Sequence, residues 1–183
     1  MVLALCGATL LSANAVSAPP HVHGVAKLDV VLEGATLQLT LDSPLANLLP
    51  FERAPRDAKE TQMVRAMAQR FAAPGALFAP SPEAACKVTA VRLSSSVLDP
   101  KLLSMGGRSA PPPGAAAAEP DEDGHADLQA DMEWRCERPR ELKGLQAGIF
   151  RQFPAMARID VQVVTPERQL AATLTPKSAV ISF

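Results

Sequence analysis

Apolar and polar residues alternate without a break from His125 to Cys136, and this segment constrains the fold more than any other. The apolar set is Ala126, Leu128, Ala130, Met132, Trp134 and Cys136, and the polar set is His125, Asp127, Gln129, Asp131, Glu133 and Arg135. Successive side chains of a β-strand point to opposite faces of its sheet. The pattern therefore predicts a strand with one face in the core and the other in water.

Two shorter segments show the same alternation and predict a β-hairpin. Residues 25–32 and 36–42 alternate apolar with polar residues and flank the turn Glu33-Gly34-Ala35. Two such runs around a glycine turn are a hairpin signal. Further strands are predicted at residues 86–93, 159–163 and 170–174, the last two forming a second hairpin.

Two segments carry apolar residues at helical spacing. Asp57 is a suitable N-cap for a helix that runs to about Phe71. Its apolar residues, which share one side of the helix, are Val64, Met67, Ala68 and Phe71. A second helix is predicted at about residues 139–153, where the apolar stripe is Leu142, Leu145, Ile149 and Phe153.

The order of these elements is ββαβ–βαββ, which predicts an α+β fold. The simplest packing is an antiparallel sheet of about six strands with two helices on one face. Only 4% of the residues are aromatic and none is Tyr, so the core must consist mainly of Leu, Val, Ala and Ile. Between the two halves, residues 99–124 are rich in Pro, Ala, Gly and acidic side chains. Such a segment buries too little apolar surface to order itself, and we expect a disordered insert.

The first 18 residues have the features of a secretory signal peptide. They contain no charged residue, and Val16-Ser17-Ala18 offers a small-residue cleavage site after an apolar run. A basic segment normally precedes such a run, so we expect the natural start to lie upstream of Met1. The run is too short for a membrane span, which needs about 20 apolar residues. We therefore expect residues 19–183 to form a single periplasmic domain with no membrane span.

Removal of the leader would also remove Cys6 and leave one pair of cysteines, Cys86 and Cys136. An even pair in an exported domain predicts a disulfide, whereas two buried free thiols would be the better interpretation in a cytosolic protein. Closing a loop of about 50 residues stabilises a domain by roughly 4 kcal/mol in the chain-entropy model. Between antiparallel strands, the bond would bring apolar residues face to face in two pairs: Val88 with Trp134, and Ala90 with Met132.

Charge and motifs exclude several classes of function. The net charge is -1 and the chain has no cluster of Lys and Arg, so a strong electrostatic attraction to nucleic acid or to an anionic membrane is excluded. The sequence contains no nucleophile elbow, no glycine-rich phosphate loop and no Cys-x-x-Cys. We therefore expect a binding protein rather than an enzyme.

All three histidines stand at positions that suit a metal site. His21 and His23 point the same way in an extended segment, so both imidazoles could reach one ion. His125 opens the alternating strand, and Asp127 follows two residues later on the same face. If the N-terminal strand runs beside that strand, these four residues form a set of ligands suited to zinc, which binds imidazole nitrogen at about 2.0–2.1 Å. The alternative interpretation is a polar tail at His21 and His23 and a solvated side chain at His125.

Several stretches resemble the ZrgA family of zinc-regulated periplasmic proteins. His21-Val22-His23-Gly24 is similar to the opening of that family, and Gly124-His125-Ala126-Asp127-Leu128 is similar to its segment after a variable insert. Further similar stretches are residues 42–55, 150–154, 164–166 and 172–176. The resemblance implies a protein that binds zinc and assists its uptake, upstream of an importer or its binding protein in the envelope. It favours His21, His23 and His125 as ligands, with Asp127 or Glu52 as a carboxylate.

The chain also departs from this family pattern. Residues 99–124 hold no His where family members commonly carry a His-rich insert, and Arg53 stands where many have a His. We therefore expect one site rather than several. Imidazole suits Cu²⁺ and Ni²⁺ as well as Zn²⁺, so the sequence leaves the metal open. The alternative function is a domain without metal that docks on another envelope protein.

Overall fold

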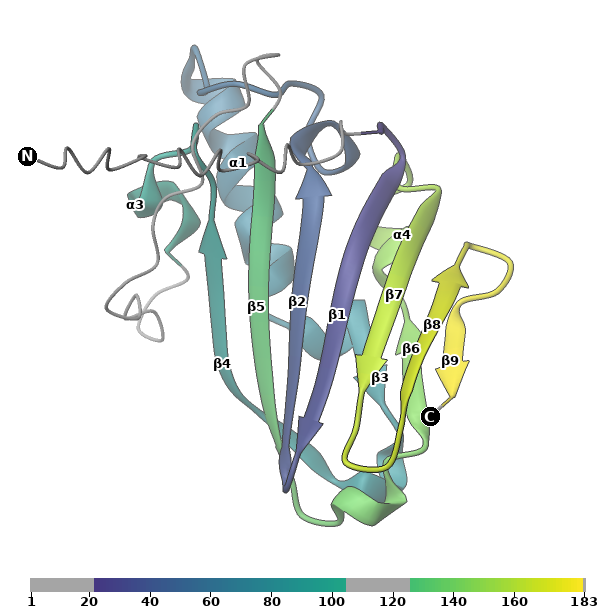
Figure 1. Cartoon of the computed structure of the whole chain (residues 1–183). Coiled ribbons are helices and arrows are strands. Elements are labelled where there is room, and N and C mark those ends of the chain that lie inside the picture. The colour runs from purple at the N-terminus through teal and green to yellow at the C-terminus, as the bar shows by residue number, and fades with distance from the viewer. Residues whose placement is uncertain (1–21, 105–125, 183) are drawn as a thin grey trace, which may run out of the picture.

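Six strands form one large sheet, with neighbours in the order β4-β5-β2-β1-β7-β8 (Figure 1). The computed structural model describes residues 22–104 and 126–182 of the chain. The six strands are β1 (Val25–Glu33), β2 (Thr36–Pro44), β4 (Cys86–Ser94), β5 (Asp127–Cys136), β7 (Arg158–Val164) and β8 (Gln169–Leu174). The α+β class is confirmed, and the predicted hairpins β1–β2 and β7–β8 are both present.

The alternating pattern that predicted β5 is confirmed by burial. All six apolar residues are buried: Ala126, Leu128, Ala130, Met132, Trp134 and Cys136. In the hairpin, Ala26, Leu28 and Val30 of β1 are buried in the same way, as are the three leucines of β2. One face of the sheet thus supplies much of the core, and the polar residues of these strands lie on the other face.

The sheet is mixed, so the prediction of a wholly antiparallel sheet is wrong. β1 pairs antiparallel with β2 on one side and parallel with β7 on the other. The Gly24 carbonyl accepts hydrogen bonds from the backbone N–H groups of Ala157 and Arg158. Because these bonds place the start of β7 beside the start of β1, the two strands run in the same direction. This contact joins segments more than 130 residues apart, and no local pattern predicts it.

A second, smaller sheet replaces the helix expected at residues 139–153, and that prediction is wrong. Its order is β3-β6-β9, with β3 (Phe78–Pro80), β6 (Gly144–Ala147) and β9 (Val180–Ser182). The four residues of the predicted stripe are buried as expected, but they do not share one helix. Leu142 follows η3 (Pro139–Glu141), Leu145 lies in β6, Ile149 begins α4 (Ile149–Gln152), and Phe153 is the C-cap of α4. Gly144 allows β9 to pair closely with β6, since a Cβ there would collide with the carbonyl oxygen of Ile181 in β9.

The predicted first helix is confirmed as α1 (Ala58–Phe71), with the Asp57 carboxylate accepting a hydrogen bond from the N–H of Glu60. Its four predicted apolar residues are buried. In Figure 1, α1, α4 and β6 all lie behind the large sheet, and no helix or strand of the described residues lies on its opposite face. The core therefore lies between the large sheet and this layer of helices and short strands. A short helix, α2 (Pro74–Leu77), leads from α1 into β3.

Part of the expected insert is ordered. Residues 99–104 contain α3 (Pro100–Leu103), which the Asp99 side chain caps by accepting a hydrogen bond from the N–H of Lys101. Leu103 is buried together with Leu98. The expectation of disorder from residue 99 is therefore wrong for this part, because two leucines anchor it, while residues 105–124 and the leader lie outside the described residues. In the described ranges, no helix is long and apolar enough to cross a membrane.

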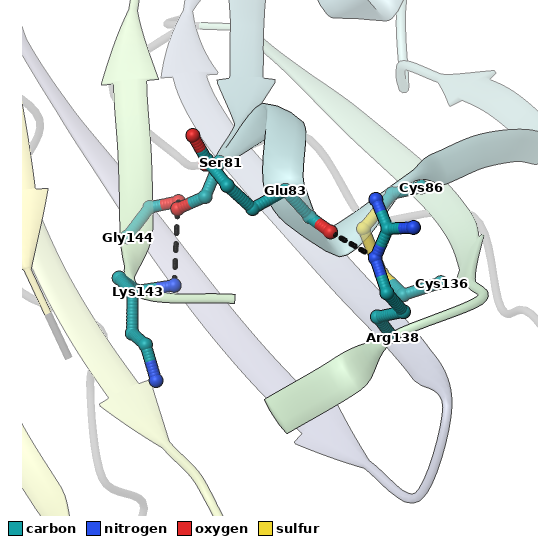
Figure 2. The surroundings of a disulfide bond; sticks show 7 residues. All are labelled: Ser81, Glu83, Cys86, Cys136, Arg138, Lys143 and Gly144. Carbon is teal, nitrogen blue, oxygen red and sulfur yellow. Dashed lines mark hydrogen bonds between the residues drawn. A yellow bond between two sulfur atoms is a disulfide. The ribbon is translucent and has the colours of Figure 1, made fainter. Parts of the chain in front are cut away.

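The predicted disulfide is confirmed between Cys86 and Cys136 (Figure 2). Val88 lies opposite Trp134 as expected, but Ala90 lies opposite Glu133 rather than Met132. A β-bulge between Val88 and Ala90 causes the difference, since the extra residue moves Val91 into the position opposite Met132.

Candidate metal site

The end of β2 lies between the starts of β1 and β5. In the register of these strands, Lys27 pairs with Asp42, and Asp127 pairs with Pro44. The N-terminal strand therefore does not run directly beside β5, as the predicted ligand set required, because β2 separates the two. Neighbouring strands lie about 4.8 Å apart, so the starts of β1 and β5 are separated by about 10 Å. Both starts still lie at one end of the sheet, at the top of Figure 1.

His23 directly precedes β1 and contacts a carboxylate. Its Nε2 atom lies 3.1 Å from Oε2 of Glu52, which belongs to the loop after η1 (Leu45–Asn47). The His23 side chain is 59% exposed and the Glu52 side chain only 17%. The other oxygen of Glu52 accepts a hydrogen bond from the Ala46 N–H at 3.3 Å. Glu52 is thus held in place by the loop, and the imidazole lies over it at the surface.

The short helix η1 connects the two strand starts. At its first residue, the Leu45 N–H donates to the carbonyl of Ala126 at 2.9 Å. At its last residue, the Asn47 side-chain oxygen accepts from the N–H of Gly24 at 2.7 Å. Gly24 follows His23 in the chain, and Ala126 follows His125. One turn therefore holds the backbone next to both histidines.

Several acidic side chains lie near Asp42 on the large sheet. Burial raises the pKa of Asp42 above its ordinary value, and the nearby carboxylates of Asp127, Asp29 and Asp131 raise it further, against an opposing effect of Lys27. Asp127 is half-buried and lies on the strand next to Asp42. Asp42 and Asp127 therefore add carboxylates to the sheet end at which His23 precedes β1.

The structure brings together some of the predicted ligands. His23 and Asp127 lie at the same end of the sheet, and Glu52 contacts His23. His21 and His125 lie outside the described residues. Within residues 22–104 and 126–182, no group of three or more His, Cys, Asp or Glu side chains is arranged to hold a metal ion. The described part of the site is therefore the imidazole–carboxylate pair of His23 and Glu52. In the sequence, His21 stands two residues before His23, and His125 stands two residues before Asp127.

One residue of this region was missed by sequence reasoning. Asn47 is 2% exposed and bonds to the backbone next to His23. The signal was present as an asparagine inside the otherwise apolar stretch Leu45-Ala46-Asn47-Leu48-Leu49. A polar side chain among residues that belong to the core predicts a buried hydrogen-bonding group.

Comparison with known proteins places the chain in one family. No curated protein matches it. The family model described as "ZrgA family zinc uptake protein" matches residues 20–183, which include both strand starts, Glu52 and the disulfide. The match extends over nearly all of the sequence that follows the predicted leader, and the chain therefore belongs to the ZrgA family of zinc uptake proteins.

Proposed function

We propose that this chain is a periplasmic, non-catalytic protein that binds Zn²⁺ and assists its uptake. Its four ligands come from His21, His23 and His125 and the carboxylates of Glu52 and Asp127. Zinc is then the cargo, which the protein passes to an importer or its binding protein in the envelope. The observation that carries the proposal is the contact between His23 and Glu52 at the end of the sheet where β1 and β5 both begin.

The geometry of this pair supports a shared ion. Zinc binds imidazole nitrogen and carboxylate oxygen at about 2.0–2.2 Å in a tetrahedral arrangement, so two of its ligand atoms lie about 3.3 Å apart. The His23 Nε2 and Glu52 Oε2 atoms are separated by 3.1 Å. The two atoms therefore need to move little to bind the same ion. Structural zinc sites have four ligands, so two of the three other residues named above complete the site.

The disulfide supports export. Disulfides persist in the bacterial periplasm and are rare in the cytosol, where thiols are kept reduced. The bond between Cys86 and Cys136 therefore agrees with the signal peptide expected at residues 1–18. The direct test of the signal peptide is N-terminal sequencing of the protein recovered from a periplasmic extract. The recovered protein should begin at residue 19.

Calorimetric titration of the purified protein with zinc tests the ligand set. At pH 7.5 we expect one zinc ion to bind with a dissociation constant below tens of micromolar. His23→Ala and Glu52→Gln should each weaken binding, and the double variant His21→Ala/His23→Ala should abolish it. Glu167→Gln is a matched control, since Glu167 is an exposed carboxylate in the turn between β7 and β8, at the other end of the sheet. Unchanged binding by the histidine variants would reject the ligands.

Two further measurements define the metal. Affinity should fall as the pH drops below about 6.5, because a protonated imidazole has no lone pair for the ion. Copper binds most imidazole sites more tightly than zinc does, so affinity alone does not identify the natural cargo. The metal content of protein purified from the periplasm without an affinity tag does so, and we expect zinc in excess over copper and nickel.

A further inference from the structure

We infer that Asn47 is a positioning residue that holds His23 over Glu52 for zinc binding. This inference rests on the proposed function of the His23 site. It assigns a role in zinc binding to a side chain that cannot itself reach the ion. The role is carried by three hydrogen bonds, which connect Asn47 to the Gly24 N–H, the Val25 carbonyl and the Ser43 hydroxyl.

Asn47 belongs to an isolated polar pair in the core. Of the polar and charged residues that the structure describes, only Ser43 and Asn47 are buried, at 0% and 2% exposure. In the chain both stand among leucines that belong to the core, Leu41 and Leu45 among them. A buried amide is unfavourable unless its hydrogen bonds are made, so a specific arrangement of partners must keep Asn47 in this position.

The amide of Asn47 is fully used. Its oxygen accepts from the Gly24 N–H at 2.7 Å. Its nitrogen donates to the carbonyl of Val25 at 3.0 Å and to the hydroxyl of Ser43 at 3.1 Å. Two of these three bonds go to the backbone within two residues of His23. Asn47 therefore fixes the peptide groups that set the direction in which His23 leaves the sheet.

Gly24 is held from a second side as well. Its φ angle is +82°, a left-handed conformation that residues with a side chain rarely adopt. Its carbonyl accepts from the N–H groups of Ala157 and Arg158 at 2.8 and 2.9 Å. With Asn47 on its N–H and the start of β7 on its carbonyl, Gly24 has little freedom. The sharp turn at Gly24 then directs His23 toward the loop that carries Glu52.

A purely structural role for Asn47 makes a different prediction. In that case Asn47→Ala would lower the stability of the protein, and the folded fraction would bind zinc as the unaltered protein does. In the positioning role, the folded variant also binds zinc more weakly, because part of the binding free energy is used to order His23. Loss of a supporting hydrogen bond around a metal site typically weakens affinity by about tenfold or more.

The test measures zinc affinity and local order in the same variants of the full chain. For Asn47→Ala, calorimetric titration at a temperature where circular dichroism shows it folded should give at least about tenfold weaker zinc binding. In the metal-free protein, exchange of the Gly24 amide hydrogen should become faster than in the unaltered protein. Ser81→Ala is the control, since the Ser81 hydroxyl, directly after β3, accepts from the Lys143 N–H at 3.0 Å, directly before β6 (Figure 2). It should lose stability and keep its zinc affinity.

A second variant covers the case in which Asn47→Ala does not fold. Ser43→Ala removes one of the three partners of Asn47 and leaves both backbone bonds in place. We expect it to bind zinc roughly threefold more weakly, as for one neutral hydrogen bond, with faster exchange at Gly24. If Asn47→Ala folds and binds zinc as tightly as the unaltered protein, the inference is wrong. If it does not fold, unchanged affinity and exchange in Ser43→Ala overturn the inference.

His23→Ala separates failure of this inference from failure of the proposed function. If His23→Ala binds zinc as the unaltered protein does, the proposed site is wrong and the role of Asn47 falls with it. If His23→Ala weakens binding and the Asn47 and Ser43 variants do not, the site stands and only the positioning role is rejected. The expected result is weaker binding in all three variants, with His23→Ala the weakest.

Discussion

Cys86 and Cys136 form the first registered pair of β4 and β5, and their disulfide lies at the joint between the two sheets. The segment before Cys86 and the segment after Cys136 also remain in contact. The N–H of Arg138 donates to the carbonyl of Ala84, and the Arg138 side chain donates to the carbonyl of Glu83 at 2.6 Å (Figure 2). The segments then pair again as β3 and β6. The disulfide thus connects the large sheet to the small one.

We predict that replacing both cysteines by serine lowers the free energy of unfolding by roughly 4 kcal/mol, the chain-entropy value for a loop of about 50 residues. Urea unfolding followed by Trp134 fluorescence measures this change, because Trp134 lies two residues from Cys136 in the core. Hydrogen exchange should also accelerate more in β3 and β6 than in β1. Glu137→Gln, which removes the exposed ion pair with Lys87 beside the bond, serves as the control and should change stability little.

Gly24 and Gly34 offer a matched pair of substitutions to alanine. Both have a positive φ, +82° and +58°, so each alanine variant should lose about 1–2 kcal/mol of stability. A Cβ at Gly34 would meet no atom within 4 Å, whereas one at Gly24 would lie 3.4 Å from the Cβ of Ala157. Only Gly24 adjoins His23. We therefore expect Gly24→Ala alone to weaken zinc binding in a calorimetric titration, and equal affinities in the two variants would contradict a directing role for this turn.

Local patterns were sufficient to predict the elements whose environment is uniform along their length. β5 and the β1–β2 hairpin each have one buried and one open face, so alternation identified them. α1 has one buried side and a capping Asp57, so its period and its start were both visible. β6 could not be identified in this way, because it has only four residues and Gly144 is buried next to Leu145, so the burial alternates only from Leu145 to Ala147. Its apolar residues happened to match helical spacing.

The candidate site was predictable only as a set of residue types. The His-x-His of residues 21–23 and the His-x-Asp of residues 125–127 are visible in the sequence. The contact of His23 with Glu52 depends on the path of the loop after β2, and the role of Asn47 depends on which polar side chain the core encloses. Both follow from tertiary packing. The parallel pairing of β1 with β7 has the same origin, since it joins distant segments through the Gly24 carbonyl.

Glu60 gives the stability a defined dependence on acid. The Arg53 guanidinium donates two hydrogen bonds to this carboxylate, at 2.7 and 2.9 Å, and with the Arg56 N–H it lowers the pKa of Glu60 to about 2. A carboxyl group with a lowered pKa stabilises the fold above its ordinary pKa, and this contribution disappears as the pH falls through the folded value. Glu60→Gln should therefore melt at a lower temperature than the unaltered protein at pH 7.

The difference between the two melting temperatures should shrink below pH 4.5, the ordinary value for this carboxyl, and vanish near pH 2. Thermal melts followed by circular dichroism between pH 7 and pH 2 measure it. Glu33→Gln provides a comparison at an exposed position at the end of β1, and its melting temperature should follow that of the unaltered protein. A constant difference for Glu60→Gln down to pH 2 would show that packing, and not the charge, stabilises this helix start.

Asp42 has the opposite effect on stability in the metal-free protein. Its pKa is raised, first by burial and then by the carboxylates of Asp127, Asp29 and Asp131, while Lys27 opposes them. A carboxyl group with a raised pKa favours the fold below its ordinary pKa, and that advantage is lost as the pH rises through the folded value. At pH 7 the ionised Asp42 therefore destabilises the fold, and Asp42→Asn should raise the free energy of unfolding by less than about 1 kcal/mol, since water partly screens the charge.

Urea unfolding of Asp42→Asn at two pH values and two salt concentrations checks this origin of the gain. The gain should be present at pH 7, disappear at about pH 3, where an isolated aspartate is mostly protonated, and decrease in 1 M salt. Asp160→Asn is the control, because Asp160 is paired with Arg158 at 3.1 Å on the same open face and should give no gain. A loss of stability in Asp42→Asn at pH 7 would mean that attraction to Lys27, its partner in the β1–β2 register, outweighs burial and the three neighbouring carboxylates.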